Sequence, residues 1–325
     1  MRQILIHFFK KQLGLVLITF LSSVQAQTRL EPIAFGNMNT WITRNIVESK
    51  IIGGRKITLY EIGDSKIRVP QNTPYINQSS PWATSSVFVQ VGRIAKGSVS
   101  VFPEKRGDGY AAKLLTHVET VKVLSLININ ALATGAIFLG QMIEPITGTK
   151  DSEKNVISGI SFTGKPSFLQ FDYKAITGGA ARKIKGSSKS GKLTGEPDYA
   201  EVQIILQNRW EDAEGKIHAK RIGTGWETFK NSTDNWQNQH RVKIYYGDIS
   251  NRNFYTNRMS LRAGNQVDYA KNSHGDIVPI QEEGWGSAKD KVTHLMIQFA
   301  SSNGGAYTGC PGNTLWIDNV ALGYQ

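Results

Sequence analysis

Apolar and polar residues alternate along several short segments of this chain, as they do in half-buried β-strands. Turn residues, most often glycine, separate the segments, and no internal repeat is present. The pattern predicts an all-β protein built as a β-sandwich or jelly roll. One apolar stretch, 125–140, is predicted to hold a short helix. The expected strands are SVFVQVGRI (86–94), GSVSVFP (97–103), PSFLQFDYKA (166–175), AEVQIIL (200–206), RVKIYYGDI (241–249), THLMIQFAS (293–301) and TLWIDNVAL (314–322).

Three of these segments carry polar side chains on one face. Because successive side chains of a strand point to opposite sides, each segment separates an apolar face from a polar one. Neighbouring strands of this kind would form a polar floor, and its amides and carboxylates suit sugar hydroxyls, which need donors and acceptors. The alternative is an ordinary solvent-exposed sheet face. The polar residues are Gln170, Asp172 and Lys174; Glu201, Gln203 and Gln207; and His294 and Gln298.

The first 26 residues have the layout of a secretory signal. A basic start precedes an apolar run from Leu13 to Leu21, and small residues end at Ala26. The run is shorter than the ~20 residues of a membrane span, and no cysteine lies near the cleavage site. We therefore expect export to the periplasm, the cell surface or the medium through a cleaved signal, and no lipid anchor. Residues 27–34 would be a short leader, and 35–325 one jelly-roll domain.

Composition limits the class of exported protein. Cys310 is the only cysteine, so stability must come from a large core and not from disulfides. The net charge of +12 falls to +9 when the three basic residues of the signal are removed (12 − 3). A basic excess fits an acidic glycan or a membrane surface, and export makes nucleic acid an unexpected partner. The basic stretch 178–198 is predicted to be a solvated loop, with anion binding as the alternative.

Most tryptophans lie beside glycine or polar residues. An indole can offer a flat apolar face and one N–H donor to a sugar ring, although each tryptophan could instead close an end of the sandwich. Loops at the ends of a sandwich can converge from distant parts of the sequence. The candidate sugar-binding residues are Trp41, Trp82, Arg106, Tyr110, Trp226, Trp285, Asn303 and Tyr307.

Six motifs, in this order, resemble the putative carbohydrate metabolism domain (PCMD) family, whose exported members occur mostly in Bacteroidetes. The resemblance runs from Phe35 to Tyr324. It implies a jelly roll similar to carbohydrate-binding modules and some glycoside hydrolases, with a glycan bound or processed in a pocket. Some members carry a lipidated cysteine and an extra immunoglobulin-like domain; neither is recognisable here. The motifs are FGNMNTW, SSPWATS, VFPEKRGDGYAAKLLT, GKPSFLQFDYKA, DYAEVQIILQNRWED and SSNGGAYTGCPGNTLWIDNVALGY.

The resemblance also implies a role for Asp318, an acidic residue inside a predicted strand. In many such jelly rolls, residues near the first and last strands hold a structural calcium ion, and Asn37 or Asn39 would join Asp318 here. The alternative is that Asp318 accepts backbone N–H bonds and fixes the last strand without a metal. No other cofactor is expected.

Catalysis would need two carboxyl groups about 5–10 Å apart. Asp172 and Glu201 are the candidates, with Glu104 as a third. No zinc helix, nucleophile elbow or phosphate loop is recognisable. Three hypotheses follow: a glycan-binding protein, which we favour; a glycoside hydrolase or lyase of undescribed type; and a structural or adhesin module.

Overall fold

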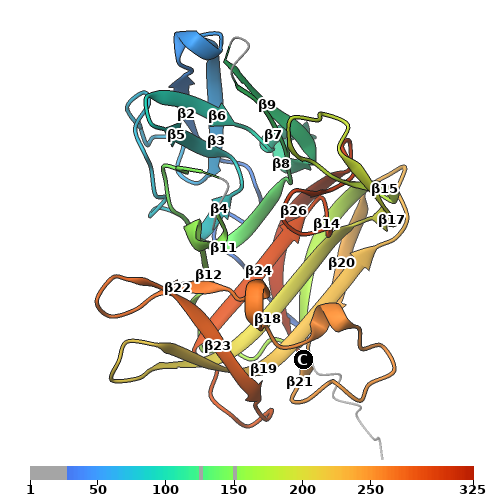
Figure 1. The fold of residues 1–325 in the computed structure, drawn as a ribbon. Coiled ribbons are helices and arrows are strands. Elements are labelled where there is room, and N and C mark those ends of the chain that lie inside the picture. The colour runs from blue at the N-terminus through green and yellow to red at the C-terminus, as the bar shows by residue number, and fades with distance from the viewer. Residues whose placement is uncertain (1–27, 124–126, 149–151) are drawn as a thin grey trace, which may run out of the picture.

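Two large β-sheets face each other across the core of the protein (Figure 1). The computed structural model describes residues 28–123, 127–148 and 152–325, so the expected signal segment lies outside the described residues. The expected all-β sandwich is confirmed. Within the described part of the chain, no helix has the length and apolarity that crossing a membrane requires.

The first sheet has six strands in the order β20-β14-β26-β8-β7, with β1 beside β26. The last strand of the chain, β26, therefore lies in the middle of this sheet. The strands are β1 (Arg29–Pro32), β7 (Val101–Arg106), β8 (Gly109–Leu115), β14 (Phe168–Ile176), β20 (Gln237–Lys243) and β26 (Thr314–Tyr324).

The second sheet has ten strands in the order β13-β24-β18-β19-β23-β22-β12-β11-β4, with β21 beside β19. An additional pairing of β11 with β24 closes seven of these strands into a ring. The strands are β4 (Trp82–Thr84), β11 (Ala136–Met142), β12 (Val156–Ser158), β13 (Ile160–Ser161), β18 (Ala200–Glu211), β19 (Ile217–Phe229), β21 (Tyr245–Tyr246), β22 (Tyr269–Lys271), β23 (Ile277–Trp285) and β24 (His294–Ala300).

Smaller elements complete the fold, and β2, β3, β5, β6 and β9 lie together at one end of the molecule (Figure 1). The described part of the stretch predicted to hold a helix, residues 127–140, instead forms β10 and most of β11, whose backbones pair with β9 and β24. The short 3-10 turns are η1 (Lys50–Ile52), η2 (Ser152–Asn155), η3 (Asn257–Met259) and η4 (Gly264–Gln266). The smaller strands are β2 (Trp41–Val47), β3 (Lys56–Ile62), β5 (Val87–Val91), β6 (Ile94–Ser98), β9 (His117–Val123), β10 (Ile127–Ala133), β15 (Gly179–Lys183), β16 (Lys185–Gly186), β17 (Lys192–Asp198) and β25 (Thr308–Gly309).

The apolar faces of the two large sheets form the main core. Phe171 of β14 meets Phe299 of β24 edge to face, with ring centroids 4.9 Å apart. Val202 and Ile204 of β18 are fully buried in the same core. The polar residues that alternate with these side chains must therefore point away from the core, on the two outer faces of the sandwich.

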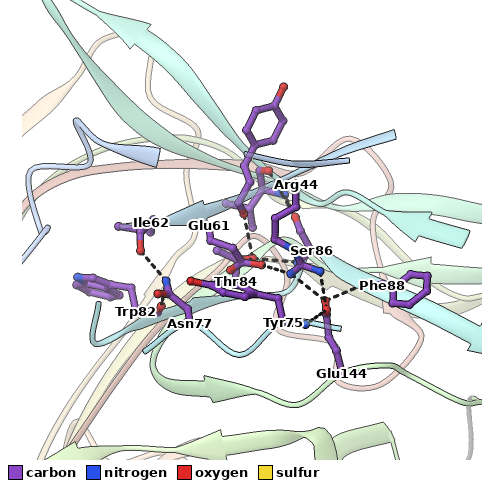
Figure 2. Close-up of polar contacts among 12 residues, drawn as sticks. Arg44, Glu61, Ile62, Tyr75, Asn77, Trp82, Thr84, Ser86, Phe88 and Glu144 are labelled. Atoms are coloured by element: carbon purple, nitrogen blue, oxygen red, sulfur yellow. Dashed lines mark hydrogen bonds and ion pairs between the residues drawn. The ribbon is translucent and has the colours of Figure 1, made fainter. Parts of the chain in front are cut away.

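A charged cluster joins the N-terminal hairpin β2–β3 to the end of β11 (Figure 2). Arg44 pairs with Glu61 at 2.8 Å and with Glu144 at 2.5 Å. Glu144 also accepts the backbone N–H groups of Tyr75 and Phe88. These contacts satisfy most of the buried charge, as burial of ionised groups requires.

Candidate functional site

A row of four side chains crosses four neighbouring strands of the ten-stranded sheet. Phe138 of β11 lies opposite Gln298 of β24, Gln298 opposite Gln203 of β18, and Gln203 opposite Trp226 of β19. The adjacent Ile204 is a core residue, so the row lies on the face turned away from the sandwich core. Two amides with an aromatic side chain at each end form a surface with donors, acceptors and apolar area.

A cleft of about 180 Å³ lies over three residues of this row, Phe138, Gln298 and Gln203, and Trp226 is not among its lining residues. Both amides of the row line it, and Phe138 forms part of its apolar wall. Its other lining residues come from β11, β12, β22 and β24, from η2, and from the end of the segment before β22, so the cleft depends on the closure of β11 onto β24. They are Leu139, Glu153, Val156, Ser158, Val267, Asp268, Tyr269, Met296 and Ile297.

Residues 257–268, here called the covering segment, cross the face that carries the row. Arg258 donates two hydrogen bonds to Glu201, at 3.0 and 2.8 Å, and Arg262 donates one to Gln203, at 2.6 Å. In Figure 1 this orange segment, with its short turns, lies in front of β18. The arginines thus attach the covering segment to the side chains beneath it.

The two glutamines are held in one orientation. Arg262 Nη2 donates to Gln203 Oε1, and Gln203 Nε2 donates to Gln298 Oε1 at 2.5 Å. Within the described residues, the Gln298 side chain has no further hydrogen bond, so its Nε2 donors are available to a ligand. Preorganised amides of this kind suit a hydroxyl-rich ligand, because each hydroxyl both donates and accepts.

Beside the row lies a group of charged side chains, here called the charged floor, with Glu282 at its centre. It forms a two-point ion pair with Arg221 and accepts hydrogen bonds from Gln207 and from the backbone N–H of Arg262. Burial opposes ionisation of Glu282, but the Arg221 charge and these hydrogen bonds outweigh it and hold the pKa below its ordinary value. The charges of Glu282 and Arg221 in the charged floor therefore offset each other.

Arg209 reaches across the ring from β18. Its Nη1 donates to the backbone carbonyl of Ser158 on β12, and its Nε donates to Gln207. Burial lowers the Arg209 pKa to about 10. His294, next to it, has its pKa lowered to about 4, first by burial and then by the Arg209 charge. Ser158 in turn donates to Asp268, which lines the cleft.

The structure brings two of the predicted sugar-binding residues to this face. Trp226 ends the row, and its Nε1 lies 3.3 Å from Glu201 Oε2. The Arg262 guanidinium lies 5.2 Å from the Trp226 ring centroid. Trp285 lies beside Arg221 at the edge of the charged floor. Both tryptophans are half-buried.

Trp41 and Trp82 were wrong predictions as sugar platforms. Trp82 is fully buried, and its Nε1 donates to the carbonyl of Ala34. Trp41 is 8% exposed and donates to the carbonyl of Met38. Both belong to the main core, so neither indole face is open to a sugar ring.

Arg106 lies on the other outer face of the sandwich, over the six-stranded sheet. Its Nη1 pairs with Asp172 at 2.9 Å and with Asp318 at 2.6 Å, and its guanidinium lies 3.9 Å from the ring centroid of Trp236. Burial raises the Asp318 pKa against the opposing effect of Arg106. Asp318 also accepts the backbone N–H of Asn319.

The proposed calcium ligands have protein partners. Asn39 accepts the backbone N–H of Tyr110, and Asn37 lies 3.4 Å from the backbone N–H of Asn39. A calcium ion at Asp318 would have to displace the Arg106 guanidinium. Among the described residues, no three or more His, Cys, Asp or Glu side chains gather as a metal site. The calcium site stays a prediction that these contacts do not support.

The proposed catalytic pair is not a pair in the structure. Asp172 lies on the outer face of the six-stranded sheet, and Glu201 on the outer face of the ten-stranded sheet, with the whole core between them. The predicted polar floor was therefore right for β18 and β24, which are neighbours, and wrong for β14. Glu104 accepts Trp316 Nε1 and pairs with Lys113, again on the six-stranded sheet.

The remaining candidates lie elsewhere. Tyr110 packs under Lys105 at the β7–β8 turn, 4.5 Å from ring centroid to Nζ. Asn303 accepts the backbone N–H of Tyr199, and Tyr307 lies under Lys185 near β15. The eight predicted residues therefore do not converge on one site.

Sequence reasoning missed the covering segment. Arg258 and Arg262 come from a stretch without a strand pattern, and nothing in its composition indicates that it crosses β18. Asp268 and Phe138 were missed for the same reason, since their position depends on the closure of the ring. Gln203 and Gln298 could be found, because alternation placed both on a polar face.

The fold and the cleft define a β-sandwich protein with a ring-enclosed cleft lined by both polar and apolar side chains. The family model of the putative carbohydrate metabolism domain (PCMD) matches residues 60–323, and the chain belongs to this family. Its function is therefore related to carbohydrate. The comparison with curated proteins finds no match.

Two solved structures resemble the chain distantly. One is described as a putative glycoside hydrolase from Bacteroides thetaiotaomicron, with 16% identity, 70% of this chain and 57% of that chain covered, and a TM-score of 0.42. The other is described as a putative glycoside hydrolase from Bacteroides vulgatus, with 17% identity, 68% and 75% coverage, and a TM-score of 0.40. The chain thus spans little more than half of the first of these proteins.

Proposed function

We propose that the protein binds a glycan in the cleft on the ten-stranded sheet. The observation that carries this proposal is the row Phe138, Gln298, Gln203 and Trp226. Fixed amides supply donors and acceptors to sugar hydroxyls, and the flanking aromatic side chains suit the apolar C–H face of a sugar ring. Membership of a carbohydrate-related family supports the same function.

The size of the cleft suits one sugar unit of a longer chain. Its volume of about 180 Å³ is below the ~300 Å³ at which pockets for drug-sized ligands begin. A terminal or side-chain sugar would enter the cleft, and the next unit would lie towards Trp226 and Glu201. Hydrolysis by the pair Asp172 and Glu201 is not part of the proposal, because the two carboxylates lie on opposite outer faces.

A glycan array screened with the purified protein, followed by calorimetry on any hit, tests the proposal. Trp226→Ala and Gln298→Ala should each weaken binding at least tenfold. The matched control is Trp236→Ala, because Trp236 is also half-buried beside an arginine but lies on the six-stranded sheet. Its affinity should stay within twofold of the unmodified protein.

Loss of binding in Trp236→Ala alone would move the site to the Arg106 cluster and overturn the proposal. An array without any hit would favour the structural or adhesin hypothesis. Mass spectrometry of the incubated glycans separates binding from turnover, since released sugars would identify an enzyme.

A further inference from the structure

A second pocket, far richer in positive charge, lies on the hairpin formed by β15 and β17. It is an open hollow of about 570 Å³. Within the described residues, neither Asp nor Glu lines it. The pocket shares no residue with the cleft. Its lining residues are Lys183, Lys185, Ser188, Gly191, Lys192, Leu193 and Thr194.

The acidic residues of the same hairpin, Glu196 and Asp198, do not line the pocket. Asp198, at the end of β17, is fully buried and accepts hydrogen bonds from the backbone N–H of Cys310 and from Asn313. Glu196 is exposed but is not among the pocket residues. Three lysines thus line one hollow in whose described wall no carboxylate lies, and a bound anion would offset their positive charge.

Local contacts hold the pocket in shape. Arg182 donates to the carbonyl of Ser190, and Ser188 accepts the backbone N–H of Gly191. On the other side, β15 pairs with β25, and the backbone N–H of Ile184 donates to the carbonyl of Tyr307. The pairing of Gly179 with Asp198 joins the two ends of the basic stretch, and these contacts fix the part between Arg182 and Gly191.

An aromatic ring and hydroxyl groups accompany the lysines. Lys185 Nζ lies 4.6 Å from the ring centroid of Tyr307. Ser188 and Thr194 add hydroxyls to the wall. Lysines together with hydroxyls in one wall suit an anion carried on a sugar better than a bare ion. A hollow with a single exposed large apolar residue, Leu193, lacks the apolar surface that docking on a membrane uses.

We propose that the Lys183–Lys185–Lys192 pocket binds the sulfate or carboxylate groups of an acidic polysaccharide, at a site separate from the cleft. The inference goes beyond the proposed function, because the two sites use different residues and different chemistry. Ammonium groups would neutralise the anionic substituents, and the hydroxyls of the wall would bond to the sugar.

Calorimetry of the purified protein with three oligosaccharides tests this inference. The probes are a chondroitin sulfate hexasaccharide, a hyaluronan hexasaccharide that carries carboxylates only, and neutral maltohexaose. The triple variant K183Q/K185Q/K192Q should lose at least tenfold in affinity for the acidic probes, and should show a weaker dependence of affinity on salt. Any binding of maltohexaose should be the same in both proteins.

The matched control is K216Q/K271Q/K291Q, which removes the same charge from three exposed lysines outside the pocket. It should change affinity less than twofold. Equal losses of affinity in the two triple variants would show that binding depends on net charge alone, and would overturn the inference. So would competition by inorganic sulfate at the concentration of the oligosaccharide, or binding to phosphatidylglycerol vesicles without binding to either acidic probe.

The two proposals fail separately. Trp226→Ala should leave lysine-dependent binding of the acidic probes unchanged. A protein that keeps this binding while the cleft variants have no effect would retain the lysine site and lose the proposed function.

Discussion

Arg44 on β2 and Glu144, just beyond the end of β11, form a two-point ion pair although 100 residues separate them (Figure 2). Both side chains are 1% exposed. Removing one partner leaves the other charge buried and unpaired, so Arg44→Ala should lower the free energy of unfolding by about 3–5 kcal/mol. Urea unfolding monitored by tryptophan fluorescence measures the change.

Arg29 and Glu31 provide the control for this pair. They lie 3.7 Å apart with exposed side chains, so Arg29→Ala should cost less than about 1 kcal/mol. If Arg44→Ala does not fold, Glu144→Gln, which keeps the side-chain shape, gives the measurement. A loss below about 1 kcal/mol in both Arg44 and Glu144 variants would contradict the role assigned to the pair.

Glu61 should make stability depend on pH. One arginine serves two carboxyl groups here, and burial, the larger effect, raises the Glu61 pKa from 4.5 to about 8. The folded state then binds a proton that the unfolded state releases, so the free energy of unfolding should fall as pH rises from about 4.5 to about 8. The slope is at most ~1.4 kcal/mol per pH unit.

Urea unfolding at several pH values, compared between the unmodified protein and Glu61→Gln, tests this dependence. The variant should lose the downward slope, because glutamine does not titrate. Parallel curves for the two proteins would show that Glu61 is ionised in both states.

His294 should act in the opposite direction. Its pKa is lowered to about 4, first by burial and then by Arg209, while an unfolded histidine titrates near 6.5. The unfolded state therefore binds more protons, and stability should be lost as pH falls from about 6.5 to about 4. His294→Gln should show a smaller loss over this range, and an NMR titration of the imidazole checks the pKa directly. A midpoint near 6.5 would refute the prediction.

Gly140 lets the backbone of β11 lie very close to the backbone of β12, with which it pairs. Its φ is +145°, and an added Cβ would lie 2.0 Å from the carbonyl oxygen of Ile157. Gly140→Ala combines a strained backbone with a backbone clash, so the free energy of unfolding should fall by at least ~2 kcal/mol. Gly284→Ala is the control, since a Cβ at that strand position meets nothing within 4 Å. Similar stabilities of the two variants would contradict the argument.

The fold class could be predicted because each strand carries its own signal. Alternation at 168–174, 200–207 and 294–300 gave the apolar faces that form the core. Alternation says which residues share a face of one strand, but not which strands are neighbours. Asp172 was therefore assigned to the same floor as Glu201, although their strands belong to different sheets.

The candidate site depends on contacts between distant parts of the chain. Phe138 reaches the cleft because β11 pairs with β24, and Arg262 because the covering segment crosses β18. No local sequence pattern predicts the pairing of β11 with β24 or the crossing of β18 by the covering segment. The tryptophans show a second limit, since Trp82 in SSPWATS and Trp226 in GTGWETF have similar neighbours in sequence. Trp82 is in the core, whereas Trp226 lies opposite Gln203 at the end of the row.

The central place of β26 in the six-stranded sheet has a consequence for the order of folding. β26 pairs with β14 on one side and with β8 and β1 on the other, yet the ribosome makes it after all of them. Until β26 emerges, β14 and β8 have unpaired edges and the sheet has a gap at its middle. The main core therefore cannot be completed before β26 is made, so folding of the sandwich waits for pairing between strands that are distant in sequence.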